Sequence, residues 1–251
     1  MFLRAVCLIA GLLILAGPSL AEDGDGGYAG AFFQVPIGAR PASMGGAYLA
    51  ISNDGAAPLY NPAGLADLQR PIFASSYRLM KLDRQLAYAT LMFPIRGNSA
   101  LGVHWLFAGS GEVERRNYDG DALGDAISQN NHAGSIIFAK RFENFFSAGV
   151  KLSYLHSTFA EMTAYSVGVD VGAMIYLDWL FGREKVGTLP IDDLQLGLTL
   201  KHLDAKYIWN NEDYIFQHVG VSEPGSEQED QVPTEFGVGL SGRLVDRKLL
   251  L

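Results

Sequence analysis

Five histidines are the residues of this chain with the most obvious catalytic or metal-binding chemistry. A neutral imidazole can bind a metal ion or act as a general base. Their positions show no metal-ligand spacing, and neither G-x-S-x-G nor H-E-x-x-H occurs in the sequence. The five are His104, His132, His156, His202 and His218. The sequence therefore predicts a protein that is not an enzyme, with no metal site and no cofactor.

An aspartate-rich stretch and an aromatic-rich stretch are the next candidates for binding. The segment DGDALGD (119–125) has three aspartates, but Leu123 breaks the EF-hand calcium pattern, which favours a solvated loop. The connection 204–233 holds four aromatic residues ahead of an acidic run: Tyr207, Trp209, Tyr214 and Phe216. One interpretation is a mobile surface loop. The other is an aromatic contact for a partner or an apolar ligand.

The stretch NDGAAPLYNPAGLADL (53–68) predicts one capped helical turn. Asn61 can accept a hydrogen bond from a free N–H group of that turn, and Pro62 suits the first helical position because it lacks an N–H group. Gly64 argues against a long helix. Upstream, Gly45–Gly46 gives a flexible entry. Two interpretations stay open: an ordinary capped turn, and a plug in the mouth of a barrel.

The N-terminal 21 residues predict a secretory signal peptide. Arg4 precedes an apolar run that ends at Ala16, and Ser19 and Ala21 suit a cleavage site before Glu22. The run is too short for a membrane-spanning helix, which needs about 20 apolar residues. The chain's single cysteine lies inside this segment, so the exported part is not a disulfide scaffold.

Composition restricts the partners and the fold class. The formal net charge of −8 argues against nucleic acid as a partner. The 29 glycines and 11% aromatic residues favour β-structure with tight turns. After the N-terminal segment no stretch has 18 consecutive apolar residues, so the sequence predicts no membrane-spanning helix.

From Pro71 onward the hydrophobic period is two, which predicts β-strands with two different faces. In 146–156, for example, Ala148, Val150, Leu152 and Tyr154 alternate with Ser147, Gly149, Lys151 and Ser153. Eight such strands are expected, at 72–79, 84–94, 98–108, 131–141, 146–156, 164–176, 193–203 and 234–244. Either a soluble sandwich or an outer-membrane barrel produces this alternation.

Strand length, face chemistry and connection lengths favour the barrel. Most of the strands approach the 9–11 residues that cross a bilayer at a tilt, and aromatic residues gather near their ends. The polar faces are rich in Gly and Ser, with occasional single charges. Three of the four connections expected on the inner side are tight, with 178–192 as the exception, whereas both of the longest, 109–130 and 204–233, fall outside.

The segment before the first strand resembles a known family. IGARPASMGGAYLAISNDGAAPLYNPAGLADL is similar to the N-terminal signature of the PorV/PorQ family of outer-membrane barrels, which are relatives of the FadL fatty acid transporters. The matching positions are Gly38, Ala39, Arg40, Met44, Gly45, Gly46, Ala47, Tyr48, Asp54 and Tyr60 to Ala66. The chain departs from the pattern at Gly55-Ala56 and at Pro58. Later segments are also similar, so the resemblance covers about 35–251.

The resemblance implies a fold and two functions. In FadL relatives the segment that matches Asn61 to Ala66 belongs to a plug inside a 14-stranded barrel. We therefore expect a signal peptide (1–21), a plug segment (22–71) and a transmembrane barrel (72–251). The PorV/PorQ type implies binding or delivery of secreted cargo proteins in type IX secretion. The alternative is FadL-like passive uptake of hydrophobic small molecules. Both place the protein in outer-membrane lipid.

The plug motif that the resemblance marks comprises Met44, Gly45, Gly46, Asn61, Pro62 and Gly64. Eight strands are visible, and KLLL (248–251) begins a ninth. Because the related barrels have 14 strands and this chain stops abruptly in a ninth, we expect a fragment of a larger barrel. A closed eight-stranded barrel is the other interpretation.

Overall fold

The structure is a computed structural model. It describes residues 29–117, 119–160, 162–181, 191–210, 215–218, 221–224, 227–244 and 249–250. The predicted signal peptide (1–21) lies outside the described residues.

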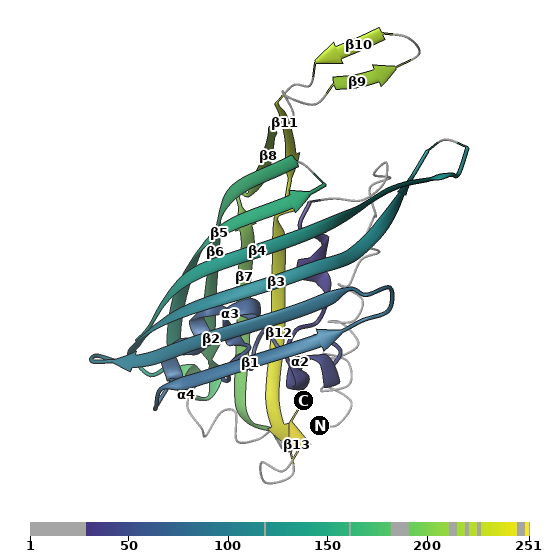
Figure 1. The fold of residues 1–251 in the computed structure, drawn as a ribbon. Coiled ribbons are helices and arrows are strands. Elements are labelled where there is room, and N and C mark those ends of the chain that lie inside the picture. The colour runs from purple at the N-terminus through teal and green to yellow at the C-terminus, as the bar shows by residue number, and fades with distance from the viewer. Residues whose placement is uncertain are drawn as a thin grey trace, which may run out of the picture.

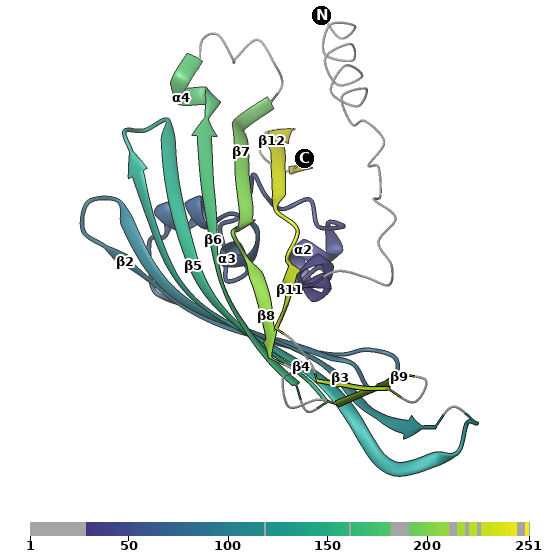
Figure 2. The ribbon, with the colours of Figure 1, turned by 90° about the horizontal axis from the view of Figure 1, so that it is seen from above.

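One antiparallel sheet dominates this part of the chain and curls strongly into a half-barrel (Figures 1 and 2). Its strands follow chain order: β1 (Ile72–Leu79), β2 (Gln85–Ile95), β3 (Ser99–Arg116), β4 (Ala122–Phe142), β5 (Phe146–Phe159), β6 (Met162–Tyr176), β7 (Ile191–Leu203), β12 (Glu235–Leu244) and β13 (Leu249–Leu250). The predicted all-β antiparallel fold is confirmed. Within the described residues β1 pairs only with β2, so the sheet does not close on itself.

Two shorter strands extend the main sheet at one end, and two others form a separate two-stranded sheet. β8 (Lys206–Asn210) pairs with β6 and with β11 (Gln228–Gln231), and β9 (Ile215–His218) pairs with β10 (Val221–Pro224). We call the end with the β1–β2, β3–β4 and β5–β6 connections the outer end, and the opposite end the inner end. At the inner end α4 (Leu177–Phe181) follows β6.

The two longest expected connections are shorter in the structure. β3 and β4 continue as a paired hairpin beyond Gly109, and only 117–121 separates the two strands. The segment 204–233 contains β8 to β11. The sequence prediction ended these strands too early because the apolar alternation stops there, although the backbone pairing goes on.

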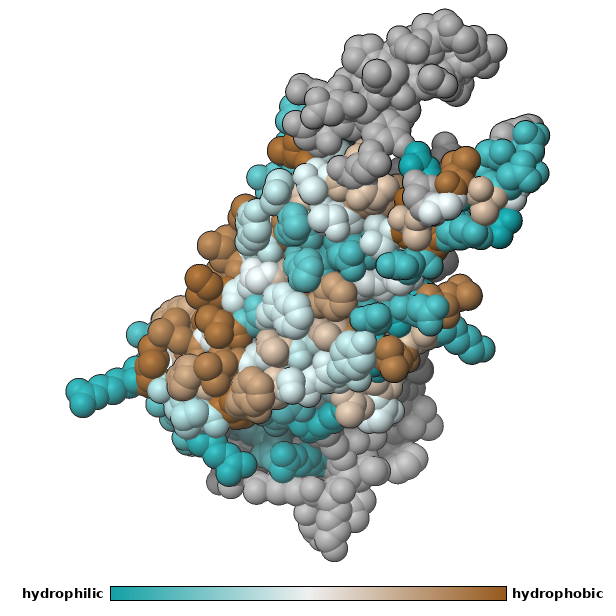
Figure 3. Space-filling view, viewed as in Figure 1, coloured by the Kyte–Doolittle hydropathy of each residue, from teal (hydrophilic) through white to brown (hydrophobic). Residues whose placement is uncertain are grey.

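The sheet's two faces differ as the alternation predicted. On β5 every second residue is buried, including Ser147, Gly149 and Lys151. The residues between them include Val150 and Leu152, which are exposed. Buried side chains face the concave side, where the N-terminal segment lies (Figure 2). The convex face therefore carries the large apolar side chains. In Figure 3 apolar residues gather over the lower left half of the sheet, and the projecting β3–β4 hairpin is mostly hydrophilic.

The described part of the N-terminal segment forms short helices. They are η1 (Ala31–Gln34), α2 (Ala39–Ser43), α3 (Ala57–Tyr60) and η2 (Pro62–Asp67). Among the described residues no helix has both the length and the apolar character needed to cross a membrane. Three apolar clusters among the described residues join this segment to the sheet, and the smallest comprises Ala63, Met174 and Tyr176. The outer cluster includes Ile37, Leu106 and Tyr207, and the inner cluster includes Leu65 and Ile137.

Candidate functional site

Glycines on the concave wall create the space for the N-terminal segment. Gly149 on β5 lies directly opposite Gly172 on β6. A Cβ atom at Gly149 would lie 2.4 Å from the carbonyl carbon of Pro62, and one at Gly172 would lie 2.1 Å from Asn61 Oδ1. No larger residue could occupy either position without moving the segment. The Asn61-Pro62 motif thus packs against the Gly-rich strand faces that the sequence showed.

Asn61 fastens this motif to the wall. Its side-chain Oδ1 accepts a hydrogen bond from Ala63 N at 3.0 Å, as the predicted N-cap requires. Its Nδ2 donates to the backbone carbonyls of Leu49 and Ala173, each at 3.1 Å. The residue is fully buried. The sequence predicted the cap but not the bond to β6, because nothing in the local pattern specifies a partner 112 residues away.

The other residues of the plug motif have different roles. A Cβ atom on Gly64 would lie 1.9 Å from Ser52 O, so Gly64 permits close packing within the segment. Gly45 and Gly46 have φ angles of 64° and 85° and form the turn after α2. A side chain there would meet open space, so the backbone conformation is what requires glycine. Met44 ends α2 and is half-buried. Asn61, Pro62 and Gly64 therefore form one contact, separate from the turn at 44–46.

Two tyrosines stabilise the same segment by hydrogen bonds. The Tyr60 hydroxyl donates to Ile37 O at 3.0 Å and accepts from Ile37 N at 3.1 Å. Burial raises the pKa of the Tyr60 hydroxyl above its usual value. Burial, followed by the neighbouring Asp54 carboxylate, also raises the pKa of Tyr48. Both groups are therefore neutral hydrogen-bonding groups at neutral pH.

Charged groups cross the middle of the concave wall. Lys151 Nζ lies 2.5 Å from Asp170 Oδ2, and both side chains are nearly inaccessible, with 6% and 3% exposed. The other Asp170 oxygen accepts a hydrogen bond from His202 N at 2.9 Å. Lys201 Nζ lies 3.8 Å from Glu235 Oε2. The buried charges are thus paired, as burial in a protein interior demands.

A hollow of about 250 Å³ lies between these charges and the N-terminal segment. Its apolar lining is Phe33, Val35, Pro36, Ile37, Leu49 and Leu59, and its polar lining includes Lys151, Lys201, His202 and Glu235. Gly45, Gly46 and Tyr60 also border it. An apolar wall beside paired charged groups suits a small amphipathic molecule.

Histidines of the described residues lie on both faces of the sheet. His104 is buried on the concave face, and neither ring nitrogen has a hydrogen-bond partner within the described residues. His132 and His156 lie on the convex face. Among the described residues no group of three His, Cys, Asp or Glu side chains could hold a metal ion.

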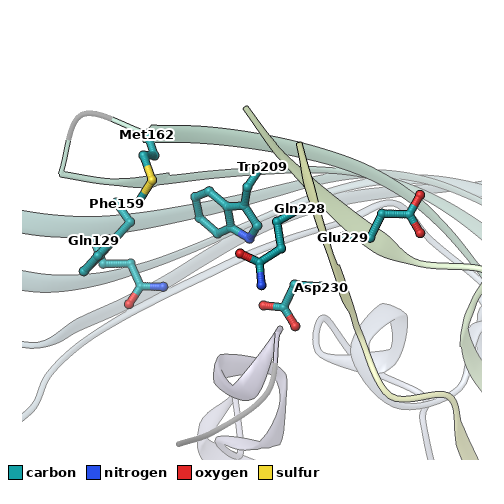
Figure 4. Close-up of a pocket in the computed structure, with 7 residues that line it drawn as sticks. All are labelled: Gln129, Phe159, Met162, Trp209, Gln228, Glu229 and Asp230. Carbon is teal, nitrogen blue, oxygen red and sulfur yellow. The ribbon is translucent and has the colours of Figure 1, made fainter. Parts of the chain in front are cut away.

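A second hollow, of about 540 Å³, lies at the outer end of the concave face (Figure 4). Its lining comprises Gln129, Phe159, Met162, Trp209, Gln228, Glu229 and Asp230. Of the four aromatic residues singled out in the sequence, Trp209 borders this hollow and Tyr207 is buried beside it in the outer cluster. Phe216 belongs to β9, and Tyr214 lies outside the described residues.

On the convex face, strand register arranges side chains in rows. The row Phe107–His132–His156–Tyr165 joins β3 to β6, with ring centroids 5.0, 6.2 and 4.9 Å apart. Two residues further toward the outer end the row is small and polar: Gln85, Gly109, Asn130, Thr158 and Thr163. Toward the inner end a row is aliphatic: Leu91, Val103, Ile136, Leu152 and Val169.

Aromatic residues also end the apolar rows at the inner end. Phe142 lies opposite Phe146 with ring centroids 6.0 Å apart, and Lys140 Nζ lies 5.5 Å from the centre of the Phe142 ring. The convex face thus carries an apolar band between two aromatic borders, which we call the convex band. It runs along β5 from Phe146 to His156.

Comparison with models of protein families finds no match to this chain, and comparison with curated proteins finds none either.

Proposed function

We propose that this chain is an outer-membrane protein of the transmembrane barrel type, with its convex band in contact with lipid. The single observation that carries the proposal is the band with its two aromatic borders. On β5 it spans ten residue steps of about 3.3 Å, or about 33 Å along the strand. A strand tilt of about 40° reduces this to about 25 Å along the membrane normal, the height of the apolar band in outer-membrane barrels.

A soluble sandwich does not account for this face. In a sandwich the large apolar side chains pack against a second sheet, and the polar face meets water. Here Ile136, Leu152 and Val167 are each at least half exposed, whereas the Gly- and Ser-rich face is covered by the N-terminal segment. Lipid is the medium in which such an inside-out arrangement is stable.

The function that we infer is binding of secreted proteins at the cell surface, as the resemblance to the PorV/PorQ family implies. Two features support it. The Asn61–Pro62 motif is packed against the wall, so the N-terminal segment fills this part of the interior. The β3–β4 hairpin continues from Phe107 to Arg116, which adds about 30 Å of strand length beyond the outer aromatic border. A partly filled interior with a projecting hairpin suits a partner-binding protein better than an open pore.

Two measurements test this proposal. First, the chain should fractionate with the outer membrane and require detergent for extraction; a freely dissolved periplasmic protein would contradict the membrane assignment. Second, a variant with residues 111–127 replaced by a tight turn should still reach the outer membrane but should reduce the surface display of secreted proteins. Unchanged display in that variant would contradict the partner-binding function.

The hollow beside Lys201 and His202 supports a second candidate, FadL-like passive uptake of hydrophobic small molecules. Its apolar lining and its charged groups suit a molecule with an apolar body and a polar end. Substitution of Leu49 by Trp would reduce the volume of the hollow. If Leu49→Trp lowers the uptake of a labelled apolar acid and leaves surface display unchanged, this candidate is favoured over the first.

A further inference from the structure

The outer hollow is built from the concave faces of separate strands. Trp209 on β8 lies opposite Gln228 on β11, and Tyr207 lies opposite Asp230. Because alternate residues of a strand share a face, Trp209, Gln228 and Asp230 point to the same side. Phe159 and Met162, at the β5–β6 connection, border the hollow near the Trp209 ring (Figure 4). One apolar wall therefore faces one polar wall.

The two carboxylates at this hollow differ in their surroundings. Glu229 alternates to the opposite face, where its Oε1 lies 2.7 Å from Lys206 Nζ, and Figure 4 shows its side chain directed away from Trp209. Asp230 has no ion pair and no side-chain hydrogen bond within the described residues. No cation lines the hollow among the residues that the structure describes. Asp230 is therefore an uncompensated negative charge beside an indole ring.

A second polar group at the same place lacks a partner. Tyr207 is 2% exposed, and its hydroxyl makes no hydrogen bond within the described part of the chain. It lies directly across from Asp230 and has its ring centroid 6.1 Å from that of Trp209. Tyr207 packs in the outer cluster and does not itself line the hollow, so its ring supports the Trp209 wall and its hydroxyl is not a contact for the ligand.

We propose that this hollow binds an arginine side chain of a protein partner. A guanidinium group stacks on a Trp ring and forms paired hydrogen bonds with a carboxylate, so Trp209 and Asp230 together match its two modes of recognition. The Gln228 and Gln129 amides supply further hydrogen-bond acceptors. The hollow is larger than one side chain and leaves room for the flanking peptide. The proposal rests on the proposed function only in taking a secreted protein as the source of the arginine.

The test uses the full chain in detergent micelles, with Trp105→Phe and Trp179→Phe so that Trp209 is the only tryptophan. The probes are acetyl-Gly-Arg-Gly-amide and the same peptide with citrulline, which keeps the shape of arginine but has no charge. Trp209 fluorescence should change in a saturable way with the arginine peptide. The citrulline peptide should bind more weakly, by a factor of roughly ten or more. Raising the salt concentration should weaken only the arginine binding.

Two matched variants identify the residue responsible. Asp230→Asn and Glu229→Gln each remove one negative charge from neighbouring positions on opposite faces. Asp230→Asn should lower the affinity for the arginine peptide roughly tenfold, and Glu229→Gln should leave it within about twofold. Asp230→Glu, which keeps the charge, should retain part of the binding and shows that a loss in Asp230→Asn is not a folding defect.

Equal affinity for arginine and citrulline peptides, or equal losses in Asp230→Asn and Glu229→Gln, would overturn the site. The proposed function fails separately. Asp230→Asn can abolish binding of the arginine peptide in micelles while cells that carry this variant display secreted proteins normally. In that case the site stands and a secreted partner is excluded as its ligand. If Asp230→Asn loses both peptide binding and surface display, the arginine site and a secreted protein as the source of the arginine are supported together.

Discussion

The Asn61 side chain donates a hydrogen bond to the backbone carbonyl of Ala173 on β6, across 3.1 Å. The same amide group bonds Leu49 O and caps η2 through Ala63 N. One buried side chain thus connects two parts of the N-terminal segment to the sheet. Since the Asn61-Pro62 motif also lies against Gly149 and Gly172, the segment has a single defined position on the wall.

Substitution of Asn61 by Ala should release the segment from the wall. It leaves two buried carbonyls and one N–H group without their partner, so we expect a loss of about 2–4 kcal/mol in the free energy of local opening. Protease cleavage within 29–70 at increasing denaturant measures this opening. Asn53→Ala is the control, because Asn53 is exposed and bonds only within the segment. Similar cleavage of both variants would contradict the role assigned to Asn61.

Gly149→Ala should displace the segment by steric overlap. The added methyl carbon would lie 2.4 Å from the carbonyl carbon of Pro62, which neither backbone can tolerate. Gly134→Ala on β4 makes the same chemical change on the convex face, where the methyl group meets nothing within 4 Å. Protease accessibility of the N-terminal segment should rise in Gly149→Ala alone. A segment that stays protected in both variants would show that it is not seated on this glycine.

The sequence predicted the sheet well because strands with one apolar and one polar face carry a strong period-two signal. All eight expected strands exist, and two apolar residues that interrupt the alternation have a structural reason. Leu106 and Ile137 are apolar but face the concave side, where they pack in the outer and inner clusters. An apolar side chain is compatible with the convex face and with the packed clusters of the concave face. The local sequence pattern alone therefore cannot show which face such a residue occupies.

The sequence predicted less well where both faces of a strand meet water. Beyond Gly109 the β3–β4 pairing continues through Glu112↔Ser128 and Val113↔Ile127, with no apolar alternation to reveal it. Contacts between distant segments were also missed. The Lys151–Asp170 pair and the Asn61–Ala173 bond depend on strand register and curl, which follow from the assembled sheet.

The Lys151–Asp170 pair should show strong coupling in a double-mutant cycle. Asp170→Asn keeps an acceptor for His202 N but leaves the Lys151 charge buried and unpaired, which costs about 3–5 kcal/mol. Adding Lys151→Met removes that charge and should restore most of the stability. Denaturant unfolding of the four proteins in micelles gives the coupling energy. Additive losses in the double variant would mean that the two charges do not interact in the folded protein.

Alkaline pH should loosen the N-terminal segment through its tyrosines. Burial raises the pKa of Tyr60 above the usual value of 10.0, so the folded form favours the protonated hydroxyl. The resulting stabilisation is fully present below about pH 10 and falls as the pH rises toward the folded-state pKa. Protease protection of 29–70 should therefore decrease from pH 10 upward. In Tyr48→Phe/Tyr60→Phe this decrease should shrink, although the protection at pH 8 will be weaker because the hydroxyl hydrogen bonds are lost.

Placing a charge in the convex band should be far more costly than placing it just outside. Leu152 and Thr158 lie six residues apart on the convex face of β5, on the inner and outer sides of the His156 row. In a bilayer Leu152→Arg should reduce the free energy of folding by about 2–4 kcal/mol, because the guanidinium group lies near the middle of the acyl chains. Thr158→Arg should change it by about 1 kcal/mol or less, since its side chain reaches the headgroup region. Folding titrations in lipid vesicles measure both values. If the two substitutions have equal effects in vesicles, the convex band does not lie in lipid.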